Sequence, residues 1–420
     1  MDHFRYIDGV LHAEHVSLEK IAGEIGSPVY VYSRATLERH AQVFRDALSG
    51  LDNPRLAFAV KANPNLAVLN VLAKQGYGAD VVSAGELDRA LAAGMRPEDI
   101  VFSGVGKTAN EMAKAIDAGI GQFNIESEEE GRELAVLAEL NGAPVLAALR
   151  VNPDVDAGTH GKISTGKSDD KFGVSIDKAK DIYARLSGLS GLNMQGIAIH
   201  IGSQLTSLDP LETAFGKIGV LVAGIRETGL IINQVDLGGG LGVPYKPGDN
   251  PPTPSEYGTM VARVTAGWNV RLIFEPGRVI AGNAGILVTR VIRVKPGAEN
   301  LPFVIVDAAM NDLARPALYD AYHDFAAVRP SGKRFTANIV GPICETGDTF
   351  AKARETDAVA AGDLAVFRTA GAYGATMAST YNSRPLVPEV LADGDRYAVV
   401  AERIQPAAIL AAEHVPDWLK

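Results

Sequence analysis

The sequence predicts an α/β protein with two parts, a (β/α)8 barrel of the TIM type followed by a mostly antiparallel β domain. From Leu56 onward, apolar strand candidates alternate with amphipathic helical stretches until eight strands have passed. After about residue 285, helical patterns become few and β-like stretches follow one another. The length of 420 residues is too great for one ordinary core, which agrees with two domains.

The residues before the alternation predict three elements. Residues 17–25 form a short helical candidate that Ser17 could cap, residues 28–32 a strand, and residues 34–48 an amphipathic helix. Because the first residues precede the barrel alternation, we expect them to join the β domain. The predicted bounds are 31–284 for the barrel and 1–30 with 285–420 for the β domain.

The barrel prediction depends on the number of alternating elements, since each segment alone is a weak signal. The strand candidates are 56–61, 79–83, 100–104, 122–126, 145–151, 196–202, 234–238 and 271–275. The helical stretches are 65–75, 84–94, 108–118, 127–141, 176–188, 209–228 and 256–267. The β domain is predicted from runs rich in Val, Ile and Phe at 286–292, 302–306, 336–340, 364–367 and 397–401.

Composition excludes several functional classes. The net charge is −10 and no basic block stands out, so we expect neither nucleic acid nor anionic membrane as a partner. The single cysteine, Cys344, cannot form an intrachain disulfide, which fits a reducing cytoplasm. Residues 1–6 lack the basic start of a secretory signal, and no long apolar window predicts a membrane span. We expect no metal.

The first barrel strand runs up to Lys61, before Asn63-Pro64 breaks the pattern. Desolvation at the mouth of a buried strand lowers the pKa of a lysine and makes it the nucleophile that a Schiff base requires. The alternative is a structural lysine whose amine reaches out to solvent at the strand end.

Other polar residues follow the later strands, and the carboxyl ends of barrel strands form the active-site rim. The candidates at this rim are Arg150, His200, Ser203, Gly239, Gly240, Glu275, Pro276, Gly277 and Arg278. Consecutive glycines let backbone N–H groups approach an anion, and the last two loops of such barrels often bind phosphate. The alternative for the glycines is a structural turn.

A phosphate site opposite a lysine at a strand end indicates pyridoxal phosphate. Lys61 would hold the aldehyde carbon, and Ser203 would help the glycines to hold the phosphate. Glu275 would face the pyridine nitrogen and keep it protonated, and His200 could stack on the ring. The alternatives are a buried salt bridge for Glu275 and a hydrogen-bonded core histidine for His200.

Four stretches carry a family resemblance: Phe58–Asn63, His200–Ser203, Gly238–Gly240 and Glu275–Arg278. Together they resemble the alanine-racemase-like class of pyridoxal phosphate enzymes, and within it the decarboxylases of ornithine, arginine or diaminopimelate. The resemblance covers nearly the whole chain and includes the order of barrel and β domain.

Further stretches resemble the diaminopimelate decarboxylases. They are His160–Gly166 with Lys171–Gly173, Gly341–Asp348, Ala370–Gly374 and Tyr381–Pro385. Ornithine enzymes usually have Cys-Asp where this chain has Cys344-Glu345. The resemblance implies a homodimer in which this loop completes the lysine site of the other subunit, with Cys344 as proton donor. A small apolar filler is the alternative for a lone thiol.

The implied reaction converts meso-diaminopimelate to L-lysine and carbon dioxide. The distal end of this small amino-acid substrate carries a carboxylate, which suits arginine, and an ammonium, which suits a carboxylate. The candidates are Arg278, Arg315 and Glu345, with the hydroxyl groups of Tyr319 and Tyr373; Tyr373 is also a candidate for the cofactor. Outside this context Arg315 would be read as a solvent-facing arginine.

Three alternatives remain. A decarboxylase of the same fold could act on ornithine, arginine or a carrier-linked amino acid. A racemase fits less well, because the β domain and the Cys-Glu loop do not suit it. The third alternative is an inactive regulatory relative, and the presence of Lys61, Glu275 and Cys344 argues against it.

Overall fold

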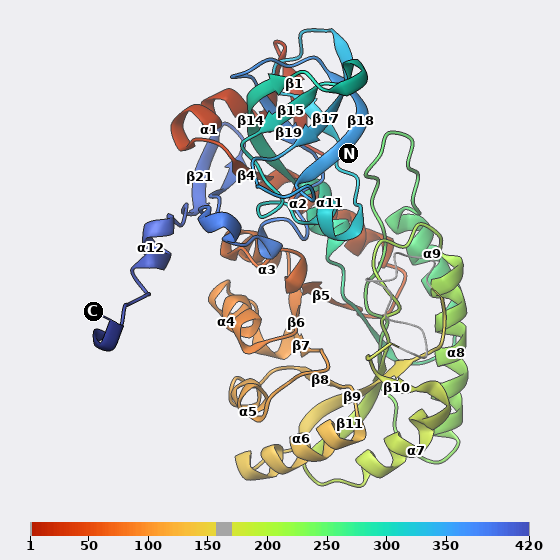
Figure 1. Ribbon diagram of the computed structural model, residues 1–420. Helices are drawn as coiled ribbons and strands as arrows, with labels where there is room; N and C mark the ends of the chain where they lie inside the picture. Colours follow the sequence, from red (N-terminus) through yellow and green to blue (C-terminus); the bar gives the residue numbers. More distant parts are fainter. Residues whose placement is uncertain (1, 157–169, 420) are drawn as a thin grey trace. The chain divides into compact units, whose positions relative to one another are not determined.

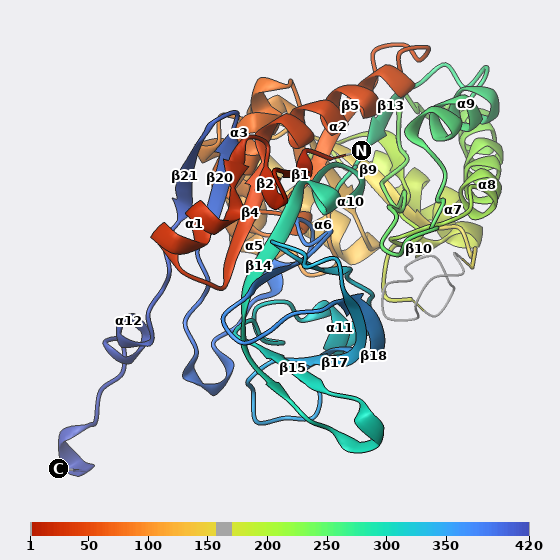
Figure 2. The same ribbon diagram turned by 90° about the horizontal axis from the view of Figure 1, so that it is seen from above.

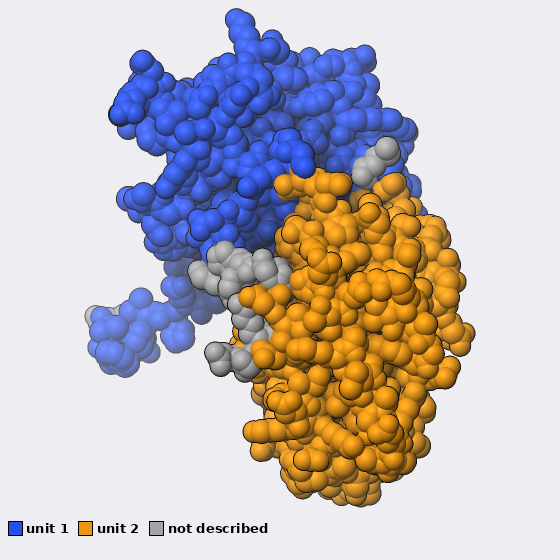
Figure 3. Space-filling model, turned by 90° about the vertical axis from the view of Figure 1, so that its right-hand side faces the viewer, with its two compact units in different colours: residues 1–37, 245–248, 281–420 blue, residues 38–244, 249–280 orange. Residues whose placement is uncertain are grey.

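The computed structural model describes residues 2–156 and 170–419. The chain divides into two compact units, coloured separately in Figure 3. Unit 1 comprises residues 1–37, 245–248 and 281–420, and unit 2 comprises residues 38–244 and 249–280. None of the helices in the described part of the chain is long and apolar enough to span a bilayer.

Unit 2 contains a closed barrel of parallel strands (Figure 1). Its strands are β5 (Arg55–Ala59), β6 (Gly78–Val81), β7 (Ile100–Phe102), β8 (Gln122–Ile125), β9 (Val145–Asn152), β11 (Leu192–Ala198), β12 (Gln234–Asp236) and β13 (Arg271–Phe274). The ring closes because β13 pairs with β5 and β8 pairs with β9. The short β10 (Val174–Ser175) adds to the edge of β9. The predicted barrel is therefore confirmed.

Helices connect these strands and lie outside them (Figure 1). They are α3 (Leu66–Lys74), α4 (Ala84–Ala92), α5 (Ala109–Asp117), α6 (Glu128–Asn141), α7 (Ile176–Ser187), α8 (Asp209–Arg226) and α9 (Pro254–Val264), with α2 (Arg34–Ala47) before β5 and α10 (Arg278–Ala281) after β13. Several begin at a polar residue whose side chain accepts a first-turn N–H: Asn65, Ser83, Thr108, Ser127 and Thr253. These caps fix where the loops before α3, α4, α5, α6 and α9 end.

The first barrel strand is shorter than predicted. β5 ends at Ala59, and Lys61 lies in a 3-10 turn formed by Val60–Ala62. The N–H of Asn63 closes this turn on the carbonyl oxygen of Val60, at 3.0 Å. The following Pro64 disfavours helical backbone at Asn63, so the turn stops there. Lys61 is thus directed by a turn rather than by a strand.

Unit 1 is built mainly from antiparallel pairs. A small sheet holds β1 (Phe4–Ile7), β2 (Val10–Ala13) and β3 (Val16–Ser17). The larger sheet holds β4 (Val29–Ser33), β14 (Gly285–Lys295), β15 (Phe303–Val306), β16 (Phe325–Ala327), β17 (Arg334–Val340), β18 (Thr349–Asp357), β19 (Leu364–Phe367), β20 (Glu389–Asp393) and β21 (Arg396–Ala401). Only β4–β20 and β15–β17 are parallel pairs in its described ladders. The predicted β domain is confirmed.

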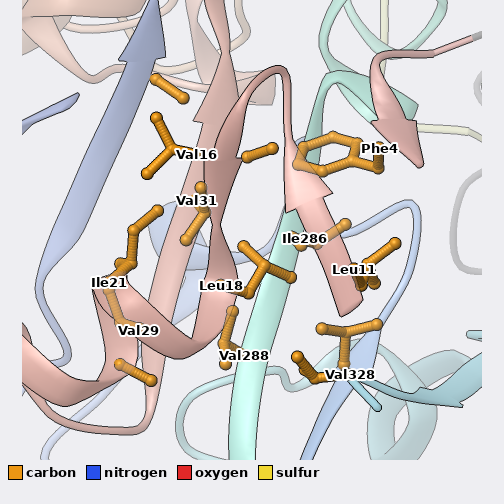
Figure 4. Packing of buried hydrophobic residues seen from close by; sticks show 14 of the residues in the cluster. Phe4, Leu11, Val16, Leu18, Ile21, Val29, Val31, Ile286, Val288 and Val328 are labelled. Carbon is orange, nitrogen blue, oxygen red and sulfur yellow. The ribbon is translucent and has the colours of Figure 1, made fainter. Parts of the chain in front are cut away.

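The start of the chain shares a core with the residues after 285. Ser17 caps α1 (Leu18–Ile25), as predicted, by accepting the N–H of Glu19. Leu18 and Val31 pack with Ile286 and other buried side chains (Figure 4). β4 lies beside the long β14 (Figure 2). The remaining helices of unit 1 are α11 (Arg315–Tyr319) and α12 (Pro406–Leu410).

Candidate active site

Lys61 meets a buried carboxylate at the mouth of the barrel. Its Nζ lies 2.6 Å from Oδ2 of Asp80, a fully buried residue of β6. The sequence predicted a desolvated amine, whereas the structure shows an ion pair and a lysine side chain that is 36% exposed. A buried carboxylate is stabilised by a partner of opposite charge, and this ion pair fixes the direction of the amine.

The glycine loop after β12 packs directly against its neighbours. Gly238 has a φ of 64° and Gly240 a φ of 113°, which favour glycine. A Cβ on Gly239 would collide with the carbonyl oxygen of Glu275, and one on Gly240 with that of Gly202. Glycine is therefore required for this close approach, and a loop without side chains lets an anion come close to the backbone.

Ser203 and Arg278 come from different loops and meet in unit 2. The Nη2 of Arg278 donates to Oγ of Ser203 at 3.0 Å, and its Nε does so at 3.3 Å. Arg278 begins α10 and is buried, while Gly277 lets the chain pass close to Ala59 and Ala62. A guanidinium and a hydroxyl group next to a glycine loop are suitable ligands for a phosphate.

His200 carries no charge in this setting. Its Nδ1 accepts the N–H of Gly239 at 3.3 Å. Desolvation, together with the positive charges of Lys61 and Arg150, holds the pKa of His200 well below its usual value. The ring is therefore neutral, with its proton on Nε2, and offers a flat uncharged face.

Burial favours the protonated form of Glu275. Desolvation raises its pKa well above the usual value, and the negative charges of Asp236 and Asp80 raise it further, against the opposing effect of Lys61. The protonated carboxyl group donates a hydrogen bond to Asp236. The carboxyl group at the end of β13 is thus a proton donor inside the barrel.

Asp236 is the hydrogen-bond acceptor in its pair with Glu275. It accepts the N–H of Gly238 at 2.9 Å and Nδ2 of Asn124 at 3.1 Å. Gln122 donates to Asn124 at 2.7 Å, and Gln234 donates in turn to Gln122. Desolvation raises the pKa of Asp236, but its N–H donors favour the ionised form. A chain of hydrogen bonds across the barrel interior therefore orients the carboxyl pair.

A second buried ion pair joins three rim loops. Arg150 donates to Oε1 of Glu126 at 2.7 Å. Glu126 also accepts the N–H of Gly104 at 3.0 Å and that of Gly173 at 2.8 Å. Arg150 lies over the ring of Phe172, 4.9 Å from its centroid. The predicted stretch Lys171–Gly173 is thus anchored at the rim, whereas His160–Gly166 lies outside the described residues.

The Cys-Glu loop lies in unit 1 and is anchored by Asp348. The carboxylate of Asp348 accepts the N–H of Ile343 and that of Met310, each at 2.7 Å. A Cβ on Gly341 would collide with this carboxylate. Cys344 is exposed, as is Glu345, so the loop presents a thiol and a carboxylate outward from a fixed base.

The remaining predicted residues also belong to unit 1. Arg315 is buried at the start of α11, and Tyr319 ends this helix, so their predicted i, i+4 relation is confirmed. Tyr373 is half-buried and has a φ of 56°. The structure therefore gathers Lys61, His200, Ser203, Gly239, Gly240, Glu275, Pro276, Gly277 and Arg278 in unit 2. It places Arg315, Tyr319, Cys344, Glu345 and Tyr373 in unit 1.

Sequence reasoning missed Asp80 and Asp236. Both are buried charged residues within apolar strands, Ala79-Asp80-Val81 and Val235-Asp236-Leu237. An aspartate in a strand that is buried on both faces is costly unless it has a partner. That cost was a signal in the sequence which could have identified them.

The unit 2 residues fit pyridoxal phosphate. Lys61 supplies an amine, the glycine loop with Ser203 and Arg278 supplies anion ligands, and Glu275 supplies a proton. Within the described residues, Oδ1 of Asp80 is a buried oxygen with no hydrogen-bond donor. This oxygen, beside the amine of Lys61, could accept a hydrogen bond from a bound ligand.

Comparisons with known proteins agree with this set. Residues 34–282 match the family described as pyridoxal-dependent decarboxylase, pyridoxal binding domain. The diaminopimelate decarboxylase of Zymomonas mobilis is 52% identical and covers 99% of each chain. That of Pseudomonas fluorescens is 49% identical and covers 98% of this chain and 99% of its own.

Solved structures are similar over the same length. Diaminopimelate decarboxylase from Helicobacter pylori complexed with L-lysine gives a TM-score of 0.90 at 35% identity, covering 94% of this chain and 98% of that one. The enzyme from M. jannaschii in co-complex with L-lysine gives 0.95 at 33% identity, covering 100% and 99%. The similarity thus includes both units.

The raised pKa of Glu275 predicts a pH effect on the stability of the cofactor-free protein. Unfolding exposes the carboxyl group, which ionises above its ordinary pKa of about 4.3, whereas the folded protein retains the proton. The unfolded state then binds fewer protons, so this group makes the free energy of unfolding fall as pH rises. Glu275→Gln removes the titration and retains a donor to Asp236.

We therefore expect the melting temperature of Glu275→Gln minus that of wild type to be larger at pH 8 than at pH 5. The control is Glu129→Gln, which changes an exposed carboxylate of α6 and should show no such trend. An equal difference at both pH values for Glu275→Gln would contradict the protonated state.

Proposed function

Because this chain belongs to the pyridoxal-dependent decarboxylases, and within them to the diaminopimelate decarboxylases, we infer that it converts meso-2,6-diaminopimelate to L-lysine and carbon dioxide. This is the last step of lysine biosynthesis. The observation that carries the reaction type is the amine of Lys61, paired with Asp80 in the barrel that also holds the glycine loop. The cofactor is pyridoxal 5'-phosphate.

Lys61 is the residue that holds the cofactor, and Gly239, Gly240, Ser203 and Arg278 hold its phosphate. Support comes from the contact between Ser203 and Arg278 and from a backbone that admits only glycine. Pro276 and Gly277 shape the loop that carries Arg278. When bound, the cofactor accepts the electron pair that the departing carboxylate leaves behind.

Glu275 acts at the pyridine nitrogen. A carboxyl group that keeps its proton can share that proton with the nitrogen, and Asp236 orients it. His200 covers the ring with a neutral imidazole, which adds no charge near the nitrogen. The hydroxyl group of Tyr373 serves the cofactor and the substrate.

Arg315 and Arg278 recognise substrate carboxylate, Glu345 recognises the distal ammonium, and Tyr319 adds a hydroxyl group. Two relatives whose structures hold L-lysine support the assignment of this product. Cys344 donates the proton that replaces the lost carboxylate. A free thiol requires a reducing environment, so the proposed location is the cytoplasm.

The functional unit is a homodimer with shared sites. Lys61 lies in the barrel and Cys344 in the β domain, on an exposed loop with a fixed base. We propose that this loop completes the lysine site of a second copy. The barrel then binds the cofactor, and the β domain supplies the Cys-Glu loop.

A substrate panel tests the activity. We expect carbon dioxide release from meso-diaminopimelate with an equal amount of L-lysine, and much slower release from LL-diaminopimelate, ornithine, arginine and lysine. Lys61→Ala should abolish turnover, whereas Lys74→Ala, which changes an exposed lysine of α3, should not. Faster turnover of ornithine or arginine would contradict the substrate assignment.

Mixed dimers test the shared site. Lys61→Ala retains an intact Cys-Glu loop, and Cys344→Ala retains an intact lysine. Neither homodimer should turn over well, but random pairing of equal amounts makes half the dimers mixed, each with one good site, so activity should return to roughly a quarter of wild type.

The two variants are purified separately, mixed under mild dissociating conditions and assayed after reassociation. Each variant taken alone through the same treatment is the control. Subunit exchange without recovery of activity would mean that the loop acts within its own chain.

A further inference from the structure

His323 is brought to the side chain of Arg315 by the chain reversal after α11. The helix ends at Tyr319, and Asp320 adopts a left-handed φ of 51°. The N–H of Ala321 bonds back to the carbonyl oxygen of Arg315 at 3.3 Å. His323 is 1% exposed, so this reversal buries its ring beside the start of the helix that it has just left.

Both ring nitrogens of His323 are bonded, and the partners determine the position of the proton. Nδ1 lies 2.9 Å from the carbonyl oxygen of Arg368, which can only accept. Nε2 lies 2.9 Å from Nη1 of Arg315, which can only donate. Nδ1 therefore carries the proton, and Nε2 accepts from the guanidinium. A doubly protonated ring would direct an N–H at that guanidinium.

Aromatic side chains complete the surroundings of Arg315. Its guanidinium carbon lies 4.6 Å from the centroid of the Tyr245 ring, within the range of a cation–π contact. The same ring meets His323 edge to face at 5.4 Å. The backbone of His323 is also held, since Arg354 donates to its carbonyl oxygen at 2.5 Å. The cradle of Arg315, defined as Tyr245 and His323, thus contacts the guanidinium through an aromatic ring and through a ring nitrogen.

We propose that His323 is a positioning residue for substrate specificity, which fixes the plane of Arg315 for the distal carboxylate of diaminopimelate. This rests on the proposed role of Arg315. A guanidinium binds a carboxylate through paired N–H groups in one plane, so its orientation determines the strength of the interaction. One bond to Nε2 together with the ring of Tyr245 fixes this plane.

Two amide substitutions separate the two ring nitrogens. Asn in His323→Asn can place its amide near Nδ1 and still donate to the carbonyl group of Arg368, but it does not reach Arg315. Gln in His323→Gln can place its oxygen near Nε2 and accept from Arg315. The experiment measures kcat and KM for meso-diaminopimelate, and the inhibition constant of 1,5-diaminopentane, a diamine of the same length that has no distal carboxylate. Arg315→Ala is measured alongside.

We expect His323→Asn to raise the KM for diaminopimelate roughly tenfold, the effect of weakening one charge-assisted hydrogen bond. The kcat and the inhibition constant of 1,5-diaminopentane should each stay within about twofold of wild type. His323→Gln should have a KM for diaminopimelate close to that of wild type. A merely structural histidine would change both ligands together, so equal changes for both would overturn the proposal.

The remaining outcomes are also decisive. If Arg315→Ala raises the KM and His323→Asn leaves it unchanged, the positioning role is wrong while the role of Arg315 stands. If Arg315→Ala leaves the KM unchanged, both assignments are wrong. If wild type releases no carbon dioxide from diaminopimelate, the proposed function itself has failed, and the inference fails with it.

Discussion

The barrel of this protein depends on a balance of charge among four buried or half-buried groups. Three acidic side chains, Asp80, Asp236 and Glu275, share its interior with the amine of Lys61. They cannot all ionise there, because each uncompensated buried charge is strongly destabilising. Lys61 neutralises Asp80, backbone and amide donors stabilise Asp236, and Glu275 retains its proton. This distribution of charge leaves the oriented amine of Lys61 and the proton donor Glu275 at the active-site rim of the barrel.

In the proposed mechanism, the two units divide the work of the reaction. The barrel supplies rigid strand ends and a glycine loop, which suit a cofactor that must be held in one position. The β unit supplies a loop anchored by Asp348 and an arginine held by His323, which suit a substrate that must be told apart from its relatives. In each unit a buried residue orients a second residue that has a proposed role. Asp80 orients Lys61 for the reaction, and His323 orients Arg315 for recognition of the substrate.

Much of this could be predicted from sequence, since the alternation from Leu56 gave the barrel and the residues after each strand gave the rim. The strand-end argument for Lys61 found the residue but not its ion pair, because Asp80 lies in another strand and only folding brings the two together. Burial of Asp236 was detectable in principle, yet which carboxyl group keeps the proton depends on donors from Gly238 and Asn124. The contact between His323 and Arg315 needs the reversal at Asp320, which no periodicity reveals.

The central claim is that Lys61, held by Asp80, is the amine that binds the cofactor. Borohydride reduction of the holoenzyme, followed by peptide mapping, tests it most directly, since reduction fixes the cofactor on the lysine that holds it. The account predicts a pyridoxyl label on Lys61 alone. Lys107 is the informative rival, because it too lies in the barrel unit and pairs with a carboxylate, but its buried amine is bound to Glu130 and two carbonyl groups. A label on Lys107, or on any lysine other than Lys61, would contradict the account.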